Sequence, residues 1–458
     1  MTAIELAELA ERALETCSGE AQATVTHERS LLSRFAHSAP TQATELDVLR
    51  VEVLCLCDGH TGSSSTTRTD AEALDGAARR ARAAAEAGAR AGAGDYPGLP
   101  APGDPPRTHD GFDAASAQPD PAAAGRALAA AFAACAASGT EAYGIWSAGA
   151  VRSALASSTG LRATDAVTDA TMRVTVIAPG GRSGFAARAG VAAGDLDAGA
   201  LAADAAERAT RPGALAELGP GEYPVVLEAA AVGELLEFLG RLGFNGLAHA
   251  EGRGALSDRL GTRVAAPAIN LADSPRARLT LPRAIDAEGV AKAPLPLIQD
   301  GVAHRVVHDT RSAARAGGGT RSTGHALVPG GDPDGPAPTN LVLSGGGAGS
   351  VEELCAPVAH GIYVTRLWYL NPVSEREALL TGVTRDGTFL IEDGRISRPL
   401  ADVRFTDSVL RLLGAVEALG TRSRLVTSGE FYGPRFATGV VCPPLRADGF
   451  RVTGGAGG

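Results

Sequence analysis

Residues 46–57, LDVLRVEVLCLC, constrain the fold of this chain more than any other stretch. Apolar side chains recur there with nearly the period of two that a strand with one buried face requires. The dipeptide Asp58-Gly59 follows directly and favours the tight turn of a hairpin. The segment therefore predicts a strand that enters a hairpin, in a sheet with one covered face. Its apolar positions are Leu46, Val48, Val51, Val53 and Cys55.

Helical and strand patterns alternate through the rest of the first half. Asp70 is a suitable N-cap for a helix rich in Ala, Arg and Glu that extends to about residue 92. This order is typical of an α+β layer in which helices cover a sheet. Further helices are predicted over 3–17, 121–137 and 196–211, and strands over 21–35 and within 141–187.

The second half consists mostly of short strands and turns, with an internal helix predicted over 229–242. Three Asp-Gly dipeptides, at 300–301, 386–387 and 393–394, lie between apolar residues and predict hairpin turns. At 458 residues the chain exceeds one ordinary core, so two domains are expected. We predict an α+β protein, with an N-terminal α/β layered domain over 1–215 and a β-rich, barrel- or sandwich-like domain over 216–458.

Composition and charge exclude several classes of function. The formal net charge is −10, and no run of Lys or Arg forms the basic footprint of a nucleic-acid-binding protein. Neither a signal peptide nor a membrane-spanning stretch is expected. The six cysteines lack the spacing of a disulfide framework, so reduced thiols in a cytoplasmic protein are expected. Cys55 and Cys57 would place both thiols on one face of their strand.

Chemically active residue types occur, but none completes a motif. His304 and His308 have a spacing that can place two imidazoles on one face of a helix or strand, as a metal pair needs. No Glu follows His304, so the H-E-x-x-H zinc motif is absent. Cys442 has no neighbouring His or helix start that would make it a nucleophile. Hydrogen-bonded histidines and a buried free thiol are the favoured interpretation, and a metal site at His304, His308 and Cys442 is the alternative.

Six segments share their order and spacing with one known family. LLSRFAHSA at 31–39 has the pattern of an S-x-T-R-F-A-N-S strand, with His37 in place of the Asn. The other segments are GHTGSSSTTRTDAEAL at 59–74, GEYPVVLEAAAVGELLEFL at 221–239, residues 340–343, HGIYVTRL at 360–367 and TGVTRDGTFLIEDGRISRP at 381–399. Together they resemble the TldD/TldE (PmbA) metallopeptidase family over nearly the whole chain.

The family contains two kinds of subunit, and the resemblance distinguishes them. TldD-type chains carry H-E-x-x-x-H on the helix that opens the C-terminal domain and a cysteine ligand nearer the C-terminus. TldE-type chains lack the histidines. Here Glu237 and Leu242 occupy the histidine positions and Phe238 the glutamate position. Leu and Phe offer zinc no lone pair, so the resemblance implies a TldE-like chain without metal or cofactor, in which Cys442 coordinates nothing.

The resemblance also implies a partner and a substrate. A TldE-like chain would form a heterodimeric peptidase with a TldD-type subunit, whose zinc would activate water. Unfolded or modified peptides would lie in a channel as an added strand, and this chain would supply part of its wall. The residues expected at the channel or interface, within 237–245 and 320–325, are Arg241, Asn245, Arg321, Thr323 and His325.

Two other functions fit the same resemblance. Family members also act as tailoring hydrolases or deacetylases on small natural products, and the Ala-, Gly- and Pro-rich composition suits an actinobacterial pathway of that kind. A non-catalytic scaffold that presents a peptide groove alone is the other alternative. The sequence leaves all three functions open.

Overall fold

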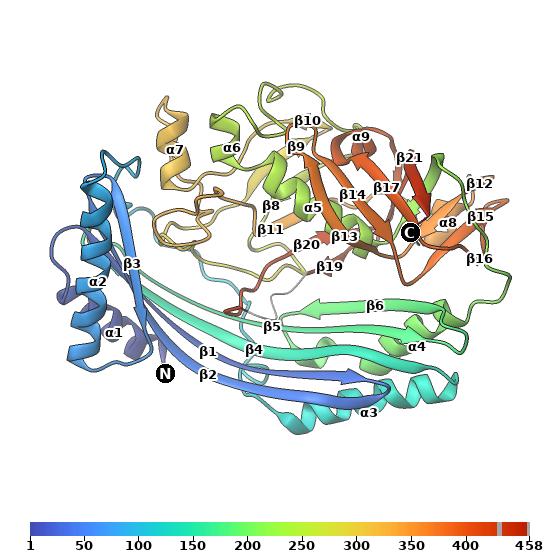
Figure 1. Ribbon diagram of the computed structural model, residues 1–458, viewed down its shortest axis with the longest axis horizontal. Coiled ribbons are helices and arrows are strands. Elements are labelled where there is room, and N and C mark those ends of the chain that lie inside the picture. Colours follow the sequence, from blue (N-terminus) through green and yellow to red (C-terminus); the bar gives the residue numbers. More distant parts are fainter. Residues whose placement is uncertain (428–432, 456–458) are drawn as a thin grey trace.

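A long antiparallel sheet forms the base of the molecule. The computed structural model describes residues 1–427 and 433–455, and its first sheet has the strand order β3-β2-β1-β4-β5-β6. Four of the strands run for 16 to 19 residues, so the sheet is elongated (Figure 1). The strands are β1 (Ala21–Ala36), β2 (Ala39–Cys57), β3 (His60–Thr66), β4 (Glu141–Ser157), β5 (Arg162–Ile177) and β6 (Ser183–Gly190).

Four helices cover one face of this sheet. A side chain that accepts a backbone N–H of the first turn caps each of them, and the cap of the second is Asp70, as predicted. The helix predicted over 121–137 is likewise confirmed. The helices are α1 (Ala3–Glu15), α2 (Ala71–Ala89), α3 (Pro121–Ala137) and α4 (Ala198–Thr210), and a 3-10 turn, Ala193–Asp195, precedes α4.

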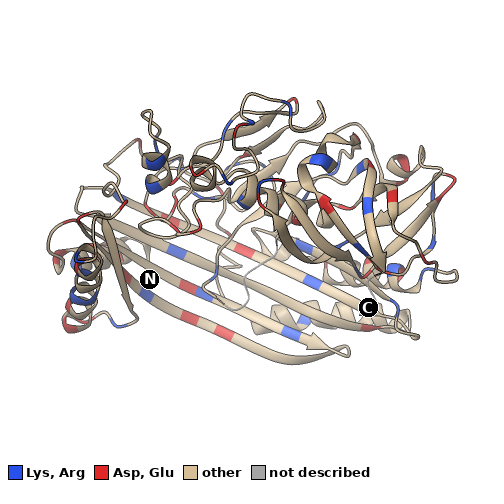
Figure 2. Ribbon diagram, turned by 45° about the horizontal axis from the view of Figure 1, so that its top comes forward, with Lys and Arg blue, Asp and Glu red and all other residues tan. Residues whose placement is uncertain are grey.

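The two faces of the first sheet differ in chemistry. On β1, Val25, Leu31 and Phe35 pack against the helices, whereas the alternate residues Glu28 and Arg34 lie on the other face. Charged residues of both signs therefore interrupt the long strands (Figure 2). We call the face away from the helices the inner face, because the C-terminal half of the chain lies across it (Figure 1).

The C-terminal half contains two further sheets. One has the order β10-β9-β8-β11-β20-β19, and the other has the order β13-β14-β17-β21-β7-β12-β15-β16, with β18 paired to β21. The first consists of β8 (Leu271–Asp273), β9 (Leu295–Gln299), β10 (Val302–Ala303), β11 (Asn340–Leu343), β19 (Arg424–Val426) and β20 (Gly439–Cys442). The second consists of β7 (Gly221–Leu227), β12 (His360–Val364), β13 (Leu367–Ser374), β14 (Leu379–Thr384), β15 (Thr388–Glu392), β16 (Arg395–Pro399), β17 (Val403–Ser408), β18 (Val416–Leu419) and β21 (Leu445–Gly455).

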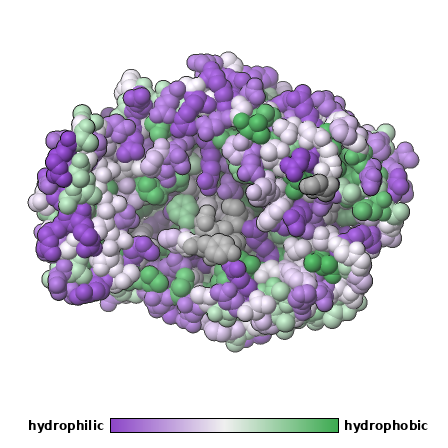
Figure 3. All heavy atoms as spheres, in the orientation of Figure 1, coloured by the Kyte–Doolittle hydropathy of each residue, from purple (hydrophilic) through white to green (hydrophobic). Residues whose placement is uncertain are grey.

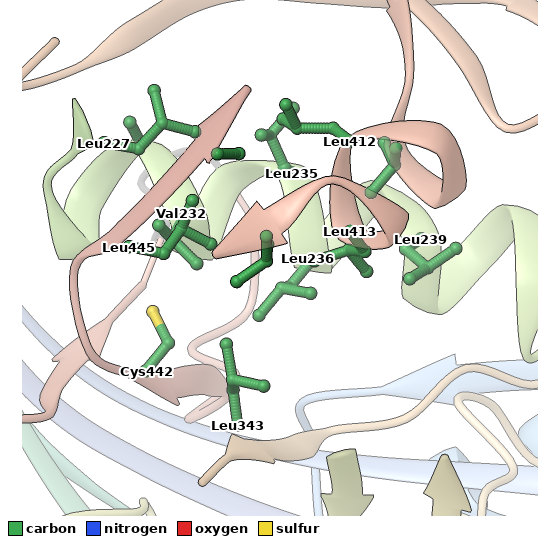
Figure 4. Packing of buried hydrophobic residues seen from close by; sticks show 14 of the residues in the cluster. Leu227, Val232, Leu235, Leu236, Leu239, Leu343, Leu412, Leu413, Cys442 and Leu445 are labelled. Carbon is green, nitrogen blue, oxygen red and sulfur yellow. The ribbon is translucent and has the colours of Figure 1, made fainter. Parts of the chain in front are cut away.

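This arrangement confirms the predicted α+β class with a β-rich C-terminal half. The two C-terminal sheets are open among the described residues, so this half resembles a sandwich and not a closed barrel. Helix α5 (Ala229–Gly243) contacts strands of both sheets. Its apolar side chains share one core with Leu343, Leu412 and Leu445 (Figure 4). The short helices of this half are α6 (Gly246–Ala250), α7 (Thr310–Ala316), α8 (Val351–Cys355) and α9 (Val409–Gly414).

The predicted Asp-Gly hairpins are confirmed at three of four positions. Asp58-Gly59, Asp300-Gly301 and Asp393-Gly394 have positive φ at both residues and join antiparallel neighbours. The prediction is wrong at Asp386-Gly387, which connects β14 to β15, two strands that do not pair. The Asp386 carboxylate instead accepts hydrogen bonds from Ser183 and Arg366 at 2.7 and 2.8 Å. These distant partners, and not a hairpin, fix this turn.

The two parts of the chain contribute strands to different sheets. Every strand of the first sheet ends before residue 191, and the strands of the other two begin at residue 221. The boundary at 215/216 itself remains a prediction. Among the described residues, the helices are all too short or too polar to traverse a bilayer.

Candidate substrate groove along helix α5

Helix α5 has one buried face and one that borders open space. Leu235, Leu236 and Leu239 are fully or almost fully buried in the C-terminal core (Figure 4). The Glu228 side chain caps the helix by accepting the N–H of Ala229 at 3.4 Å. The other face carries side chains that are partly or fully exposed, namely Glu234, Glu237, Phe238 and Arg241.

This second face borders a cavity of about 400 Å³ between α5, β5 and β13. Arg173 of β5 supplies one wall, and residues 367–370 of β13 supply the opposite wall. Two of these side chains are unusually exposed for aromatic residues, Trp368 at 40% and Tyr369 at 76%. The cavity thus combines charged groups from two parts of the chain with an aromatic rim.

Glu234 is the most perturbed carboxyl group in this cavity. Burial raises its pKa to about 8, although the nearby charges of Arg366 and Arg173 oppose the shift. Its buried Oε2 atom has no hydrogen-bond partner among the described residues. At neutral pH most of the Glu234 side chains are therefore protonated, and a carboxylic acid can donate a hydrogen bond as well as accept one. Glu234 is suited to bind a polar group of a ligand.

Arg366 holds the first sheet and β13 together beside Glu234. Its guanidinium lies 4.1 Å from the ring centre of Phe185 in β6 and 4.3 Å from that of Trp368. The buried ion pair with Asp386 fixes its position at 2.8 Å. This wall of the cavity is consequently built from both halves of the chain.

Two more cavities extend this space along the inner face. One shares Arg173 and Glu234 with the cavity above, and the next shares Thr171 with it. The three cavities therefore adjoin one another, and together we call them the groove; the surface is hollowed between the two halves (Figure 3). Its far part is lined by polar side chains of the first sheet, including Glu28, Arg34 and Ser147.

Arg435 crosses the groove and ties the C-terminal segment to the first sheet. Its guanidinium forms a two-point ion pair with Asp169 of β5, at 2.7 and 2.9 Å, and donates to Ser147 Oγ at 3.0 Å. Its backbone N–H donates to Glu28 Oε2 at 2.9 Å. These bonds join residues that lie 266 to 407 positions apart in the chain.

Comparison with protein families identifies the chain. Residues 220–454 match the model of the PmbA/TldA metallopeptidase C-terminal domain, and residues 112–211 match that of the central domain. The chain belongs to the PmbA/TldD family. The resemblance found in the sequence is thereby confirmed, and so is the general assignment to metallopeptidase-like proteins.

Solved structures of similar fold cover almost the whole chain. TldE from Thermococcus kodakarensis has a TM-score of 0.82 at 18% identity and covers 99% of this chain and 100% of its own. A proposed modulator of DNA gyrase from Thermotoga maritima has a TM-score of 0.84 at 19% identity, and the match covers 97% of this chain and 99% of that protein. A proposed modulator of DNA gyrase from Bacteroides thetaiotaomicron has a TM-score of 0.78 at 20% identity, and the match covers 98% of each chain. At these identities the likeness shows the fold.

A curated relative matches over a shorter region. A metalloprotease from Methanothermobacter thermautotrophicus is 27% identical over 175 residues, which is 38% of this chain and 37% of that protein. The match thus spans little more than a third of the relative's length. Activity and substrate of this PmbA/TldD protein are therefore matters for proposal.

The three positions predicted to replace the family's metal motif all lie on α5, but their side chains do not converge. Leu242 is buried in the core, and Glu237 lies 3.8 Å from Arg241, its neighbour one turn along the helix. Phe238 is partly buried and packs against the core beneath it. Over residues 1–427 and 433–455, no group of three His, Cys, Asp or Glu side chains is placed to hold a metal ion. This donor set does not fit zinc.

Cys442 is separated from those positions. It lies at the end of β20, and its thiol donates to the carbonyl of Ala229 at 3.3 Å, in the first turn of α5 (Figure 4). Glu237 is eight residues further on, roughly 12 Å along the helix axis. Burial raises the pKa of Cys442 well above its ordinary value, so the thiol stays protonated. The structure thus shows a buried free thiol, as the sequence favoured.

The His304 and His308 pair is not formed. Neither residue lies in a helix or strand, and His304 is exposed whereas His308 is buried. The His308 ring is 3.3 Å from Ser312 Oγ, and burial lowers its pKa. The alternative metal site at His304, His308 and Cys442 therefore lacks the required geometry, because an irregular segment does not impose the one-face spacing assumed for a helix or strand.

The predicted channel residues separate into two groups. Arg241 borders the groove, and Arg321 is exposed on its loop. The other three lie inside the C-terminal half. Asn245 caps α6 and donates to Asp334 O at 2.6 Å, and Thr323 Oγ1 accepts from the N–H of His308 at 2.7 Å. Their polar side chains satisfy buried backbone groups.

His325 is fully buried, which corrects its expected place in a channel. Its Nε2 lies 3.2 Å from Asp273 Oδ1, and the ammonium of Lys292 lies 3.4 Å from the same oxygen. Although burial opposes it, the charges of Lys292 and His325 lower the pKa of Asp273. This internal ionic cluster holds the long connection between β8 and β11 in place.

Sequence reasoning missed several residues that line the groove. Arg173 lies on a strand that the alternating pattern identified, but its role depends on which element packs above it. Glu234 was inside a quoted segment and carried no separate signal. Trp368 and Tyr369 belong to none of the predicted motifs, yet both are exposed beside the groove.

Proposed function

We propose that this chain is the TldE-like subunit of a TldD/TldE-type metallopeptidase, and that it binds no metal itself. The observation that carries the proposal is the pairing of a substrate-sized groove along α5 with Glu237, Phe238 and Leu242 at the motif positions. Because these side chains cannot hold zinc, hydrolysis requires a second subunit that carries the complete motif. Unfolded or modified peptides, the substrates that the family resemblance implies, would bind in this groove.

This chain would bind and orient the peptide. The polar inner face of the first sheet offers hydrogen-bonding side chains such as Ser147 and Thr171 along the groove. Protonated Glu234 would donate to a peptide carbonyl, and Trp368 and Tyr369 would pack against an apolar side chain. Zinc bound to the partner would supply the activated water.

Co-expression with a TldD-type homologue from the same genome tests the proposal. We expect a stable complex that contains zinc and cleaves an unfolded polypeptide such as reduced, alkylated casein. Alanine at either motif histidine of the partner should remove both zinc and cleavage. Glu237→Ala in this chain should leave the zinc content of the complex unchanged, because Glu237 is not a ligand.

Three outcomes would contradict the proposed function or favour one of its alternatives. Stoichiometric zinc in the isolated chain, lost on replacing His304 and His308, would contradict it. A complex that deacetylates small molecules but leaves casein intact would favour the tailoring hydrolase. Absence of any complex, combined with peptide binding by this chain alone, would favour the scaffold.

A further inference from the structure

Two cysteines from different elements meet beside α2, far from the groove. Cys17 follows the last turn of α1, and Cys55 lies on β2 directly opposite Ala21 of β1. The N–H of Leu56 donates to the carbonyl of Glu20 at 2.9 Å, which brings the segment 17–20 alongside the end of β2. Cys17, Cys55 and Cys57 all belong to one apolar cluster with alanines of α2.

The side chain of Arg82 confirms how close these segments are. Its Nη1 atom lies 3.5 Å from the carbonyl oxygen of Ser18 and 3.5 Å from that of Leu56. One guanidinium thus spans the residues that adjoin Cys17 and Cys55. Because the guanidinium also pairs with Glu86 at 2.7 Å, its main effect here is to hold the two segments together.

The two thiols differ in accessibility and in acidity. Cys17 is partly exposed, whereas Cys55 is 1% exposed. The Cys17 thiol donates to the carbonyl of Ala13 at 3.4 Å, and the Cys55 sulfur lies 4.0 Å from the carbonyl oxygen of Ala78. The interaction between the neighbouring thiols lowers the pKa of Cys17 and, together with burial, raises that of Cys55. An accessible, more acidic thiol beside a second cysteine is the arrangement of oxidant-reactive sites.

We propose that Cys17 and Cys55 form an oxidation site, at which a hydroperoxide generates a disulfide that joins α1 to β2. The Cys17 thiolate attacks the peroxide, the O–O bond breaks, and the products are Cys17 sulfenic acid and, with hydrogen peroxide as oxidant, water. The Cys55 thiol then attacks the sulfenic sulfur, and its proton leaves with the hydroxyl as a second water. Two thiols are oxidised and one peroxide is reduced.

Cys57 is the other cysteine near this site, and strand geometry disfavours a disulfide between it and Cys55. Cys55 and Cys57 lie two residues apart on β2, so their Cβ atoms are roughly 6.5 Å apart on one face of the strand. A disulfide needs Cβ atoms about 3.5–4.5 Å apart. Cys57 therefore cannot bond to Cys55 unless the strand distorts, and it serves as a matched control.

Peptide mapping after oxidation tests the site. The reduced full-length chain is treated with hydrogen peroxide, alkylated and digested with trypsin without reduction. Cleavage at arginines places Cys17 in peptide 13–29 and both Cys55 and Cys57 in peptide 51–68. We expect these two peptides cross-linked, with a mass 2 Da below the sum of peptide 13–29 and peptide 51–68 alkylated at Cys57, and release of both by dithiothreitol.

Variants assign the bond to its residues. Cys17→Ser should abolish the cross-link, whereas Cys57→Ser should leave its yield within about twofold of wild type. Cys55→Ser and Cys55→Ala should both abolish the cross-link, and circular dichroism of each variant confirms that the chain has folded. A loop within peptide 51–68, or oxidation of Cys17 to the sulfinic acid without any cross-link, would overturn the proposal. The buried Cys135, Cys355 and Cys442 should remain alkylatable only after unfolding.

Discussion

Replacing Arg435 with alanine removes the main link between the C-terminal segment and the first sheet. The substitution deletes a two-point ion pair and a hydrogen bond, and it leaves the Asp169 carboxylate without its cation. Removal of one partner from a buried pair costs about 3–5 kcal/mol. Since the two side chains retain 11% and 16% of their exposure, we expect the lower end, about 3 kcal/mol.

Urea unfolding followed by tryptophan fluorescence measures this loss in each half separately. Trp146 lies in β4 of the first sheet and Trp368 in β13 of the C-terminal half. Variants that retain one tryptophan each therefore report on one half, and both should show a lower midpoint if Arg435 couples them. Asp169→Asn and the double variant complete a cycle, in which we expect a coupling of about 2 kcal/mol.

A matched control separates this effect from loss of charge alone. Arg126 pairs with Asp120 at 3.5 Å, and its side chain is 72% exposed. Arg126→Ala should change the stability by less than about 0.5 kcal/mol, because exposed pairs contribute little. Arg435 does not couple the two halves if its alanine variant unfolds at the wild-type midpoint, or if the effects of Arg435→Ala and Asp169→Asn are additive.

Three other substitutions test the core and the buried charges. Leu236→Ala, at a fully buried position in α5, should lower the free energy of unfolding by about 3 kcal/mol in the same urea assay, and a loss below about 1 kcal/mol would contradict the packing. The stability of Glu234→Gln relative to wild type should increase as the pH rises from about 5 to 8. In the wild type the folded state keeps a proton on Glu234 that the unfolded carboxyl releases near its ordinary pKa, so folding of the wild type becomes less favourable over this range. A pH-independent difference would exclude the raised pKa of about 8. Lys292→Met leaves Asp273 buried without its ammonium and should cost about 3 kcal/mol or more by thermal or urea unfolding, a loss that Asp273→Asn in the same chain should partly restore.

Local signals in the sequence predicted the elements well. Asp70 was predicted as an N-cap and caps α2, and Asp120, which precedes the helix predicted over 121–137, caps α3. The segment 46–57 belongs to β2, and Val51, Val53 and Cys55 lie on the face that packs on helices, whereas Leu46 is exposed. In such cases each signal and its consequence lie within a few residues of one another.

Long-range pairing accounts for what the sequence did not reveal. His325 was expected at the channel or interface, but it is buried in the interior beside Asp273, which also contacts Lys292. The groove requires Arg173 and Glu234 to face each other across two separate parts of the chain. No local pattern encodes such a meeting, because it depends on how complete sheets pack against each other.

The bond network of Arg435 also has a consequence for folding during synthesis. The first sheet and its helices can assemble once residue 210 has been made, and domains generally fold from the N-terminus as units. Until Arg435 leaves the ribosome, Asp169 lacks this cation, although Arg366 and Asp386 can already contact the first sheet through Phe185 and Ser183. A late-translated residue therefore completes the contact between the halves, and a nascent protein that stalls before residue 435 leaves Asp169 without its ion-pair partner.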